Sequence, residues 1–198
     1  MIKNIDIILS TRNPSKAEQI KAVFIGSSFN ILTLDEVGIQ GEAIEDSFTL
    51  KENSLKKALF ARRPGQWSMA DDTGIFITVL NGAPGIRAAR WAGETATTEE
   101  ITLHTLKSLE DKTDRSAFFE TVVALISPEG KEYFFNGKVV GRILKSPKLP
   151  PQPKMPYSAI FAPEGMDKVW AEMTIEEENN ISHRGQAFKQ AREFLENY

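Results

Sequence analysis

The chain contains no cysteine and carries little excess charge of either sign. Without cysteine it cannot form disulfides, thiolate metal sites or a cysteine nucleophile, and this composition fits a reducing compartment. A net charge of −3 argues against a general nucleic-acid binder, because such proteins need a basic face. No apolar run approaches the length of a membrane span or a signal peptide. We therefore expect a cytoplasmic protein that binds neither nucleic acid nor membrane.

Hydrophobic periodicity predicts both helices and strands. Strands are expected over residues 5–10, 29–34, 68–70, 75–79, 117–126, 132–140 and 157–161, and helices over 14–25, 48–61, 97–109 and 183–195. Five prolines within residues 145–156 indicate a loop. Because strands and helices mix without a strict βαβ repeat, we predict an α/β fold with a mixed, elongated sheet and two lobes, forming one domain over residues 1–198.

Two adjacent carboxylates, Asp71 and Asp72, stand between strand-like segments and are followed by Thr73 and Gly74. This placement predicts that the pair lies at a strand end or at a bend in a sheet. Two neighbouring acids are costly to pack unless they bind something positive, and a divalent metal is the usual partner. The alternative for these residues alone is a solvated Asp-Asp turn.

The segment from Thr11 to Lys16 joins a predicted strand to a helix that opens with Asn13 and Pro14. Free backbone N–H groups and the helix dipole favour an anion there, and Lys16 adds a donor. The segment lacks the glycines of a P-loop. The alternative is a plain helix cap with a surface lysine.

Two further groups of residues offer charge beside helix starts. His183 and Arg184 follow the helix cap Ser182 and carry several N–H donors for a carbonyl oxygen or phosphate. Glu45 and Asp46 precede the predicted helix over residues 48–61 and could complete a metal site with the aspartate pair. Exposed basic residues and solvated acids are the respective alternatives.

Taken together, six segments occur in a fixed order: Thr11-x-Asn13-x-x-Lys16, Glu52-Asn53-x-x-x-Lys57-Ala58, Asp71-Asp72-Thr73-Gly74, Leu80-Asn81-Gly82-Ala83-Pro84-Gly85, Ala89-Arg90-Trp91-Ala92-Gly93 and Ile181-Ser182-His183-Arg184-Gly185. This set resembles the inosine triphosphate pyrophosphatase family from about Ile5 to Leu195. The resemblance implies hydrolysis of non-standard purine nucleoside triphosphates, such as ITP, dITP and XTP, to the monophosphate and pyrophosphate. It also implies a cleft between two lobes, a Mg²⁺ requirement and a homodimer.

The resemblance assigns residues to the phosphate and metal end of such a site. Thr11, Asn13 and Lys16 match the phosphate-binding loop, Lys57 a second phosphate contact, and Thr73 a substrate contact. Asp72 matches the catalytic and metal-linked carboxylate. Glu45 is the best match to the second metal ligand, although Glu42 or Asp46 could take that place because the segment aligns loosely.

At the base end the sequence departs from the family. His183 and Arg184 match base-recognition residues, but the family's Gly-Phe-Gly-Tyr-Asp-Pro segment is replaced by residues 154–159, which include Tyr157. Met155 stands for the stacking aromatic, Ser158 for the base-contacting aspartate, and Glu178 for a lysine. Gln19 replaces a common glutamate, a change to which we attach less weight.

Losing a lysine and an aspartate removes a matched donor and acceptor for a 6-oxopurine, each worth about 1–3 kcal/mol. A pair between Lys154 and Glu178 across the cleft could restore the match; the alternative is that both are solvated. We therefore predict a Mg²⁺-dependent nucleoside triphosphate pyrophosphatase with altered or relaxed base choice. The rival prediction is a catalytically impaired nucleotide-binding homologue with a structural or regulatory role.

Overall fold

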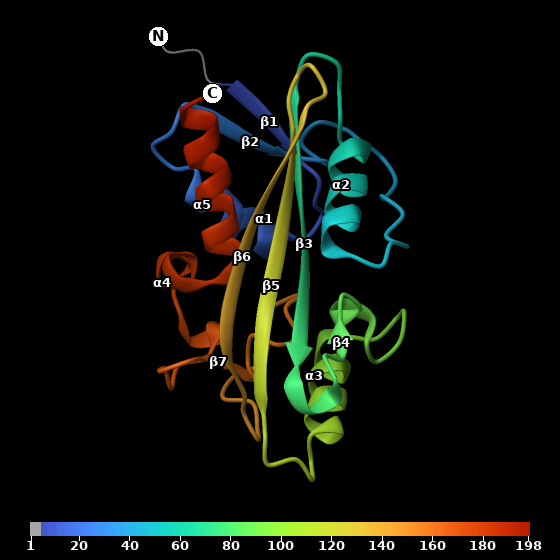
Figure 1. The fold of residues 1–198 in the computed structure, drawn as a ribbon, viewed down its shortest axis with the longest axis vertical. Helices are drawn as coiled ribbons and strands as arrows, with labels where there is room; N and C mark the ends of the chain where they lie inside the picture. Colours follow the sequence, from blue (N-terminus) through green and yellow to red (C-terminus); the bar gives the residue numbers. More distant parts are fainter. Residues whose placement is uncertain (1–4) are drawn as a thin grey trace.

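The computed structural model describes residues 5–198, and one long curled sheet runs through them (Figure 1). Its strands lie in the order β2-β1-β3-β5-β6-β7, and the short β4 pairs with β3. The strands are β1 (Ile5–Leu9), β2 (Phe29–Thr33), β3 (Trp67–Ile77), β4 (Pro84–Gly85), β5 (Ser116–Ile126), β6 (Glu132–Ile143) and β7 (Phe161–Pro163). The strands β2, β1 and β3 are parallel, and all other pairings are antiparallel.

Five α-helices flank this sheet, and local capping signals explain where they begin. They are α1 (Pro14–Val23), α2 (Leu50–Phe60), α3 (Thr98–Ser108), α4 (Ile175–Ile181) and α5 (His183–Glu196). Asn13 caps α1 ahead of a proline, Thr97 opens α3 with a capping box, and Ser182 caps α5. Four helices are therefore confirmed close to their predicted bounds, whereas α4 was not predicted.

In the half of the molecule that contains β1 and β2, helices cover both faces of the sheet. On one face α1 and α5 pack together, and Ile20 and Phe188 are fully buried there with Leu9. On the other face α2 buries Ala58 and Ala61. Burial of a large apolar side chain contributes about 1.5–3 kcal/mol, so these contacts hold the helices that carry the site.

A second core fills the other half, where the sheet packs against α3 and residues 157–161. Its buried members include Ile75, Phe119, Phe161 and Trp170. Because β3, β5 and β6 run through both halves, they join the two lobes (Figure 1). The predicted mixed, elongated α/β fold is confirmed.

Two local predictions are wrong. Asp71 and Asp72 lie in the middle of the eleven-residue strand β3. Ten consecutive residue pairs with β5 keep this strand continuous through both aspartates. Residues 157–160 form turns, and the strand begins only at Phe161. The apolar run was read as a strand because these turns are buried. Across residues 5–198, no helix has the length and apolar character needed to cross a bilayer.

Candidate active site

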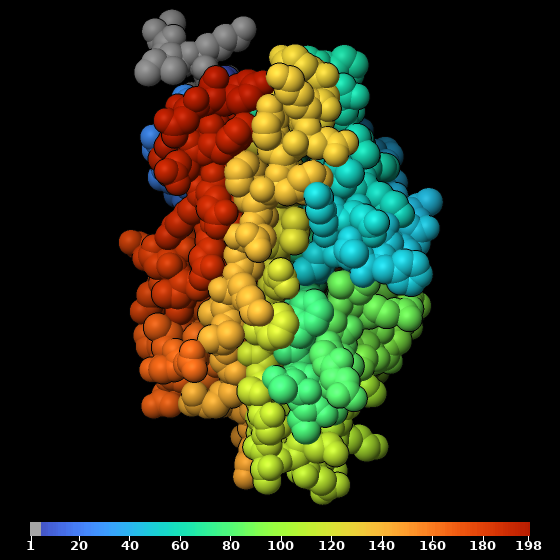
Figure 2. Space-filling model, viewed as in Figure 1, coloured from blue at the N-terminus to red at the C-terminus, as the bar shows by residue number. Residues whose placement is uncertain are grey.

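The site lies where one edge of β3 has no strand beside it. Along that edge β1 pairs with β3 as far as Met69, and β4 joins only at Ile75. Among the described residues, positions 70–74 therefore face no neighbouring strand on this side. A cleft of about 770 Å³ opens there, between the α1–α2 half and the α3–β4 half of the molecule. Figure 2 shows the cyan segment around α2 meeting the green segment around β4 on one face.

The two aspartates reach opposite faces of the sheet, because successive side chains on a strand alternate. Asp71 turns toward α1, where its Oδ2 accepts a hydrogen bond from Lys16 Nζ at 3.0 Å. Asp72 turns toward α2, where its Oδ1 accepts one from Lys57 Nζ at 2.9 Å. Asn53 Nδ2 donates a further hydrogen bond to Asp72 at 3.3 Å. Each buried acid thus has its own lysine, and the open edge of β3 lets both pairs meet in one cleft.

Three cations act on Asp71, two of them on its own face of the sheet. Burial alone would raise its pKa, but the charges of Lys16, Arg184 and Lys57 outweigh burial and hold the pKa well below its usual range. Thr73 Oγ1 donates to the same carboxylate at 3.1 Å and lies 2.6 Å from the Thr121 hydroxyl on β5. Asp71 is therefore ionised, and its group is held rigidly.

On the other face, Lys57 sits between two carboxylates. Its Nζ also donates to Glu45 Oε2 at 3.2 Å. Burial would lower the pKa of Lys57, but Asp72, Asp71 and Glu45 together raise it. Burial raises the pKa of Asp72, and Lys57 opposes that shift. Glu45 and Asp72 thus converge on one positive charge.

This pair of carboxylates suits a Mg²⁺ ion. Across residues 5–198 no group of three or more histidine or acidic side chains is arranged to hold a metal. Mg²⁺, however, is usually bound by one or two carboxylates together with substrate phosphates, rather than by an all-protein cage. The donor set therefore fits a metal whose remaining ligands are waters and substrate phosphates. Asp46 instead pairs with the exposed Lys56, and Glu42 is exposed, whereas Glu45 shares Lys57 with Asp72.

The phosphate-loop residues predicted from the sequence line the same cleft. Asn13 Oδ1 accepts hydrogen bonds from the backbone N–H groups of Ser15 and Lys16 at 3.1 and 3.3 Å. Thr11 Oγ1 accepts one from the Asn13 N–H at 3.2 Å. Asn13 Nδ2 donates to the carbonyl of Lys154 at 3.3 Å, which brings the proline-rich loop against the start of α1.

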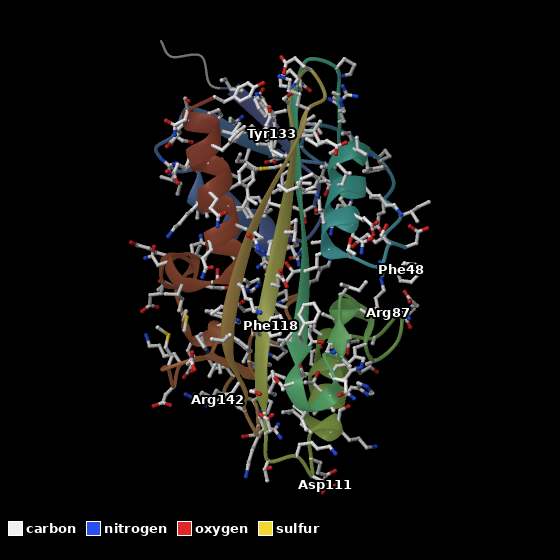
Figure 3. The ribbon with its side chains drawn as sticks, in the orientation of Figure 1. Phe48, Arg87, Asp111, Phe118, Tyr133 and Arg142 are labelled. Atoms are coloured by element: carbon white, nitrogen blue, oxygen red, sulfur yellow. The ribbon has the colours of Figure 1, made fainter. Side chains whose placement is uncertain are left out.

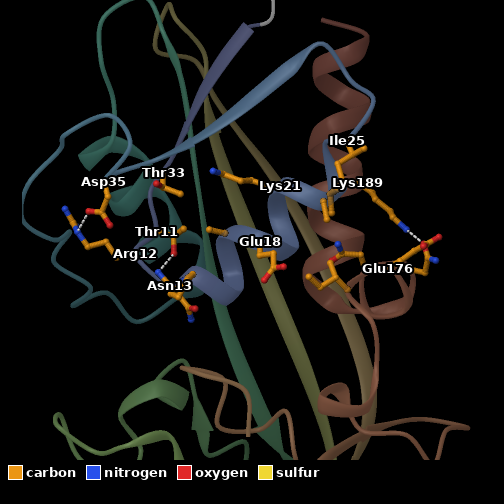
Figure 4. Close-up of a pocket in the computed structure, with 17 residues that line it drawn as sticks. Thr11, Arg12, Asn13, Glu18, Lys21, Ile25, Thr33, Asp35, Glu176 and Lys189 are labelled. Carbon is orange, nitrogen blue, oxygen red and sulfur yellow. Dashed lines mark hydrogen bonds and ion pairs between the residues drawn. The ribbon is translucent and has the colours of Figure 1, made fainter.

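The cleft has one wall in each half of the molecule. Phe48 lies on one side and Arg87 on the other, as Figure 3 shows. A larger and more open groove, of about 1050 Å³, runs along α1 beside α4 and α5 (Figure 4). It is lined by residues such as Glu18 and Lys21 and contains neither aspartate of β3. The smaller cleft, which holds both acid–lysine pairs, is therefore the candidate active site.

The residues predicted to contact a base lie beside the cleft instead of lining it. They are Met155, Tyr157, Ser158, Glu178, His183 and Arg184. The His183 ring stacks on Phe119 with centroids 4.5 Å apart, and burial lowers its pKa well below the usual value. Tyr157 donates its hydroxyl hydrogen to the Ala88 carbonyl at 2.9 Å. The Ser158 hydroxyl donates to the Met155 carbonyl and accepts from the Gln152 N–H, both at 2.8 Å. A base-contacting role for these residues stays a prediction.

The suggested pair between Lys154 and Glu178 is not formed in the described structure. Lys154 is exposed, whereas Glu178 is buried and accepts a hydrogen bond from Gln19 Nε2 at 2.7 Å. Gln19 Oε1 in turn accepts one from Arg184 at 2.8 Å. Gln19, to which the sequence analysis attached little weight, therefore links Glu178 to Arg184. Gln19 follows Lys16 by three residues, about one helical turn. This spacing was the sequence signal that the two side chains share one face of α1.

Two residues that hold the acids in place were also missed. Asn53 belongs to a motif that the sequence analysis used only for its lysine, four residues further along α2. That spacing places both side chains on one face of the helix, toward Asp72. Thr121 carried no sequence signal, because only the register of β5 against β3 sets it opposite Thr73.

Fold and cleft together define the class: mixed α/β proteins with a long curled sheet and two acid–lysine pairs at a gap in its edge. The chain belongs to the Ham1 family, whose model matches residues 7–194. It is 38% identical over 193 residues to the dITP/XTP pyrophosphatase of Caldanaerobacter subterraneus subsp. tengcongensis, a match that covers 96% of this chain and 95% of the relative. The family resemblance seen in the sequence motifs is confirmed.

Solved structures agree with this assignment. A HAM1 protein from Coxiella burnetii superposes with a TM-score of 0.84 at 31% identity, covering 98% of this chain and 100% of that chain. The Ham1 protein of Staphylococcus aureus gives 0.82 at 30% identity, covering 97% of this chain and 98% of that one. The similarity extends over nearly the whole chain and includes both halves of the cleft.

Proposed function

We propose that this protein hydrolyses non-standard purine nucleoside triphosphates, such as dITP, XTP and ITP, to the nucleoside monophosphate and pyrophosphate. The observation that carries the proposal is the meeting of Lys16–Asp71 and Lys57–Asp72–Glu45 at one cleft. Curated relatives that are 38% identical over nearly the whole chain are named dITP/XTP pyrophosphatases. The acids and lysines have the opposed charges that polyphosphate chemistry needs.

Lys16 and Lys57 bind the polyphosphate tail in this proposal. A triphosphate that enters the cleft meets Asp71, Asp72 and Glu45, and each like-charge pair 4 Å apart costs about 4 kcal/mol at an effective dielectric near 20. The lysines offset this repulsion and stabilise the charge that moves onto the pyrophosphate leaving group. Glu45 and Asp72 would hold Mg²⁺, which would supply the positive charge that offsets the acids and the developing charge on the phosphates.

Asp72 orients the attacking water and takes its proton. A carboxylate in the cleft can serve as the general base for such a water. Asn53 and Lys57 fix the carboxylate from two directions, at 3.3 and 2.9 Å. Direct attack by water is the simplest route, since the chain has no cysteine nucleophile.

Base choice is the feature in which we expect this chain to differ from its relatives. Ser158 and Glu178 stand at positions where the family resemblance implies an aspartate and a lysine. Ser158 uses its hydroxyl within a turn, and Glu178 is tied to Gln19. With neither matched contact directed at a 6-oxopurine, discrimination between bases should be altered or relaxed.

Pyrophosphate release tests the function. It should be measured with Mg²⁺ across dITP, XTP, ITP, GTP, ATP and dUTP, beside an Asp72→Asn variant. We expect turnover of at least one non-standard purine triphosphate by the wild type, and a loss of about 10²-fold or more in kcat for the folded variant. Binding without turnover of any nucleotide would favour the rival, a non-catalytic nucleotide-binding homologue. Near-normal turnover by Asp72→Asn would remove that residue from its role.

Four further proposals rest on family resemblance or composition. They are a requirement for Mg²⁺, a homodimeric state, a cytoplasmic location and a single catalytic domain over residues 1–198. The three long strands shared by both halves support the single domain. Light scattering that gives the mass of one 22.1 kDa chain would argue against the dimer.

A further inference from the structure

A buried polar network joins three helices behind the cleft. Gln19 on α1, Glu178 on α4 and Arg184 on α5 are each about 4% exposed. Gln19 Nε2 donates to Glu178 Oε2 at 2.7 Å, and Gln19 Oε1 accepts from Arg184 Nη1 at 2.8 Å. A neutral amide therefore lies between a buried acid and a buried guanidinium.

The two partners allow the Gln19 amide only one orientation. A guanidinium has only donors, so it needs the amide oxygen, and a carboxylate needs the amide N–H. Asn179 Nδ2 also donates to the backbone carbonyl of Gln19 at 2.8 Å, which ties α4 to the same turn of α1. An amide rotated by 180° would leave both charged partners unsatisfied, at a large cost in a buried site.

Arg184 connects this network to the cleft. Its Nε lies 3.5 Å from Asp71 Oδ2 and, among the described residues, forms no hydrogen bond. The same Asp71 oxygen accepts the hydrogen bond from Lys16 Nζ at 3.0 Å. Two cations thus lie beside one oxygen atom of Asp71.

We propose that Gln19 is a positioning residue: by holding Arg184 away from full contact with Asp71, it keeps Asp71 available to place Lys16 in the cleft. Glu178 acts through Gln19, because its carboxylate fixes the amide that holds Arg184. This inference rests on the proposed function for its kinetic consequences. Its structural consequence, the placement of Lys16, does not depend on turnover.

Removing the amide should release Arg184. In Gln19→Met the side chain keeps its approximate volume but offers Arg184 no acceptor. The guanidinium then moves onto Asp71 and weakens the hold on Lys16. We expect kcat to fall about tenfold, while KM changes less, because Lys16 acts on the leaving group. Gln190→Met is the matched control. Gln190 is exposed on α5, donates a hydrogen bond to the Asn136 carbonyl and takes no part in the network around Arg184.

A reciprocal exchange separates positioning from simple loss of packing. Gln19→Glu alone places two carboxylates in contact and should lose activity. Gln19→Glu combined with Glu178→Gln restores one acid, one amide and an acceptor for Arg184, so activity should recover toward the wild type. Failure of the folded double variant to recover beyond either single variant would contradict the proposal.

The reactivity of Lys16 gives a readout independent of catalysis. Acetylation by acetic anhydride, followed at Lys16 by mass spectrometry, should be faster by about threefold or more in Gln19→Met, because a less firmly paired amine reacts more readily. The Gln190→Met control should match the wild type. Unchanged Lys16 reactivity and unchanged kcat in Gln19→Met would overturn the inference. Absence of turnover in the wild type would refute the proposed function, while the labelling would still decide the role of Gln19.

Discussion

Lys57 offers a direct test of how the cleft balances its charges. Its Nζ lies 2.9 Å from Asp72 Oδ1 and 3.2 Å from Glu45 Oε2. At an effective dielectric near 20, each contact corresponds to a gross attraction of about 5–6 kcal/mol. Desolvation offsets much of this, and removing one partner of a buried pair costs about 3–5 kcal/mol. Because Glu45 is partly exposed, we expect Lys57→Met to cost about 3 kcal/mol.

For a chain of this length, that loss corresponds to a decrease in Tm of about 6–12 °C. Thermal unfolding without metal should show it directly, together with a fall in kcat. Saturating Mg²⁺ should raise the Tm of Lys57→Met more than that of the wild type. The reason is that the metal replaces the missing positive charge between Asp72 and Glu45, and binding to the folded state alone stabilises it.

Lys56→Met provides the matched control, because this neighbouring lysine does not line the cleft and pairs with the exposed Asp46. Exposed pairs contribute about 0–1 kcal/mol, so its Tm should stay within a few degrees of the wild type. Two results would refute the reasoning. One is a Lys57→Met variant that melts with the wild type. The other is an equal Mg²⁺ shift in both proteins, which would contradict the replacement of the Lys57 charge by the metal.

Three further predictions address the metal ligand, the packing and the pH response. Glu45→Gln should raise the Mg²⁺ concentration needed for half-maximal turnover by about tenfold or more, whereas Asp46→Asn should leave that concentration unchanged. Metal titrations of activity would measure both. Gly137→Ala should destabilise the fold by about 2 kcal/mol or more in urea unfolding, because a Cβ there would collide with the carbonyl oxygen of His183. Gly165→Ala, in open space with a φ of 74°, should cost only about 1 kcal/mol. Burial and the charge of Arg184 hold the pKa of His183 well below its usual value. As the pH falls through about 6.5, this histidine is therefore protonated in the unfolded chain but stays neutral in the folded protein. The folded state therefore loses stability as the pH falls below about 6.5, by up to about 1.4 kcal/mol per pH unit. His183→Gln should abolish this part of the loss. Urea unfolding midpoints of both proteins, compared between about pH 7.5 and pH 5.5, would measure it.

The helix starts could be predicted because capping is local. Asn13 with Pro14, Thr97 with Glu100, and Ser182 each satisfy backbone N–H groups within their own turn, so a few residues suffice to mark the boundary. The helix α4 was missed although Thr174 and Glu177 form a capping box. It has seven residues and an acidic first turn, so it lacks the apolar stripe that identified the longer helices.

The continuity of β3 through Asp71 and Asp72 could not be predicted from local propensity. Aspartate is depleted in strands, so two in succession indicate a strand end or a turn. Here ten pairs with β5 hold the strand in register, and a lysine on each face satisfies each carboxylate. The tertiary pairing outweighs the local preference, and the partner strand and both lysines are distant in the sequence.

The exchange at Gln19 and Glu178 shows why the base end was the hardest part to predict. The two residues are 159 positions apart, and the family resemblance implies a glutamate and a lysine at these positions. Examined one at a time, the change to Glu178 removes a contact, and the change to Gln19 carries little weight. In the structure the oxygen of Gln19 still accepts from Arg184, and its N–H group meets the new acid. The requirement that survives is the match of donors to acceptors around the guanidinium, which either a glutamate or an amide can meet at position 19. Substitutions in such a network must therefore be judged as pairs.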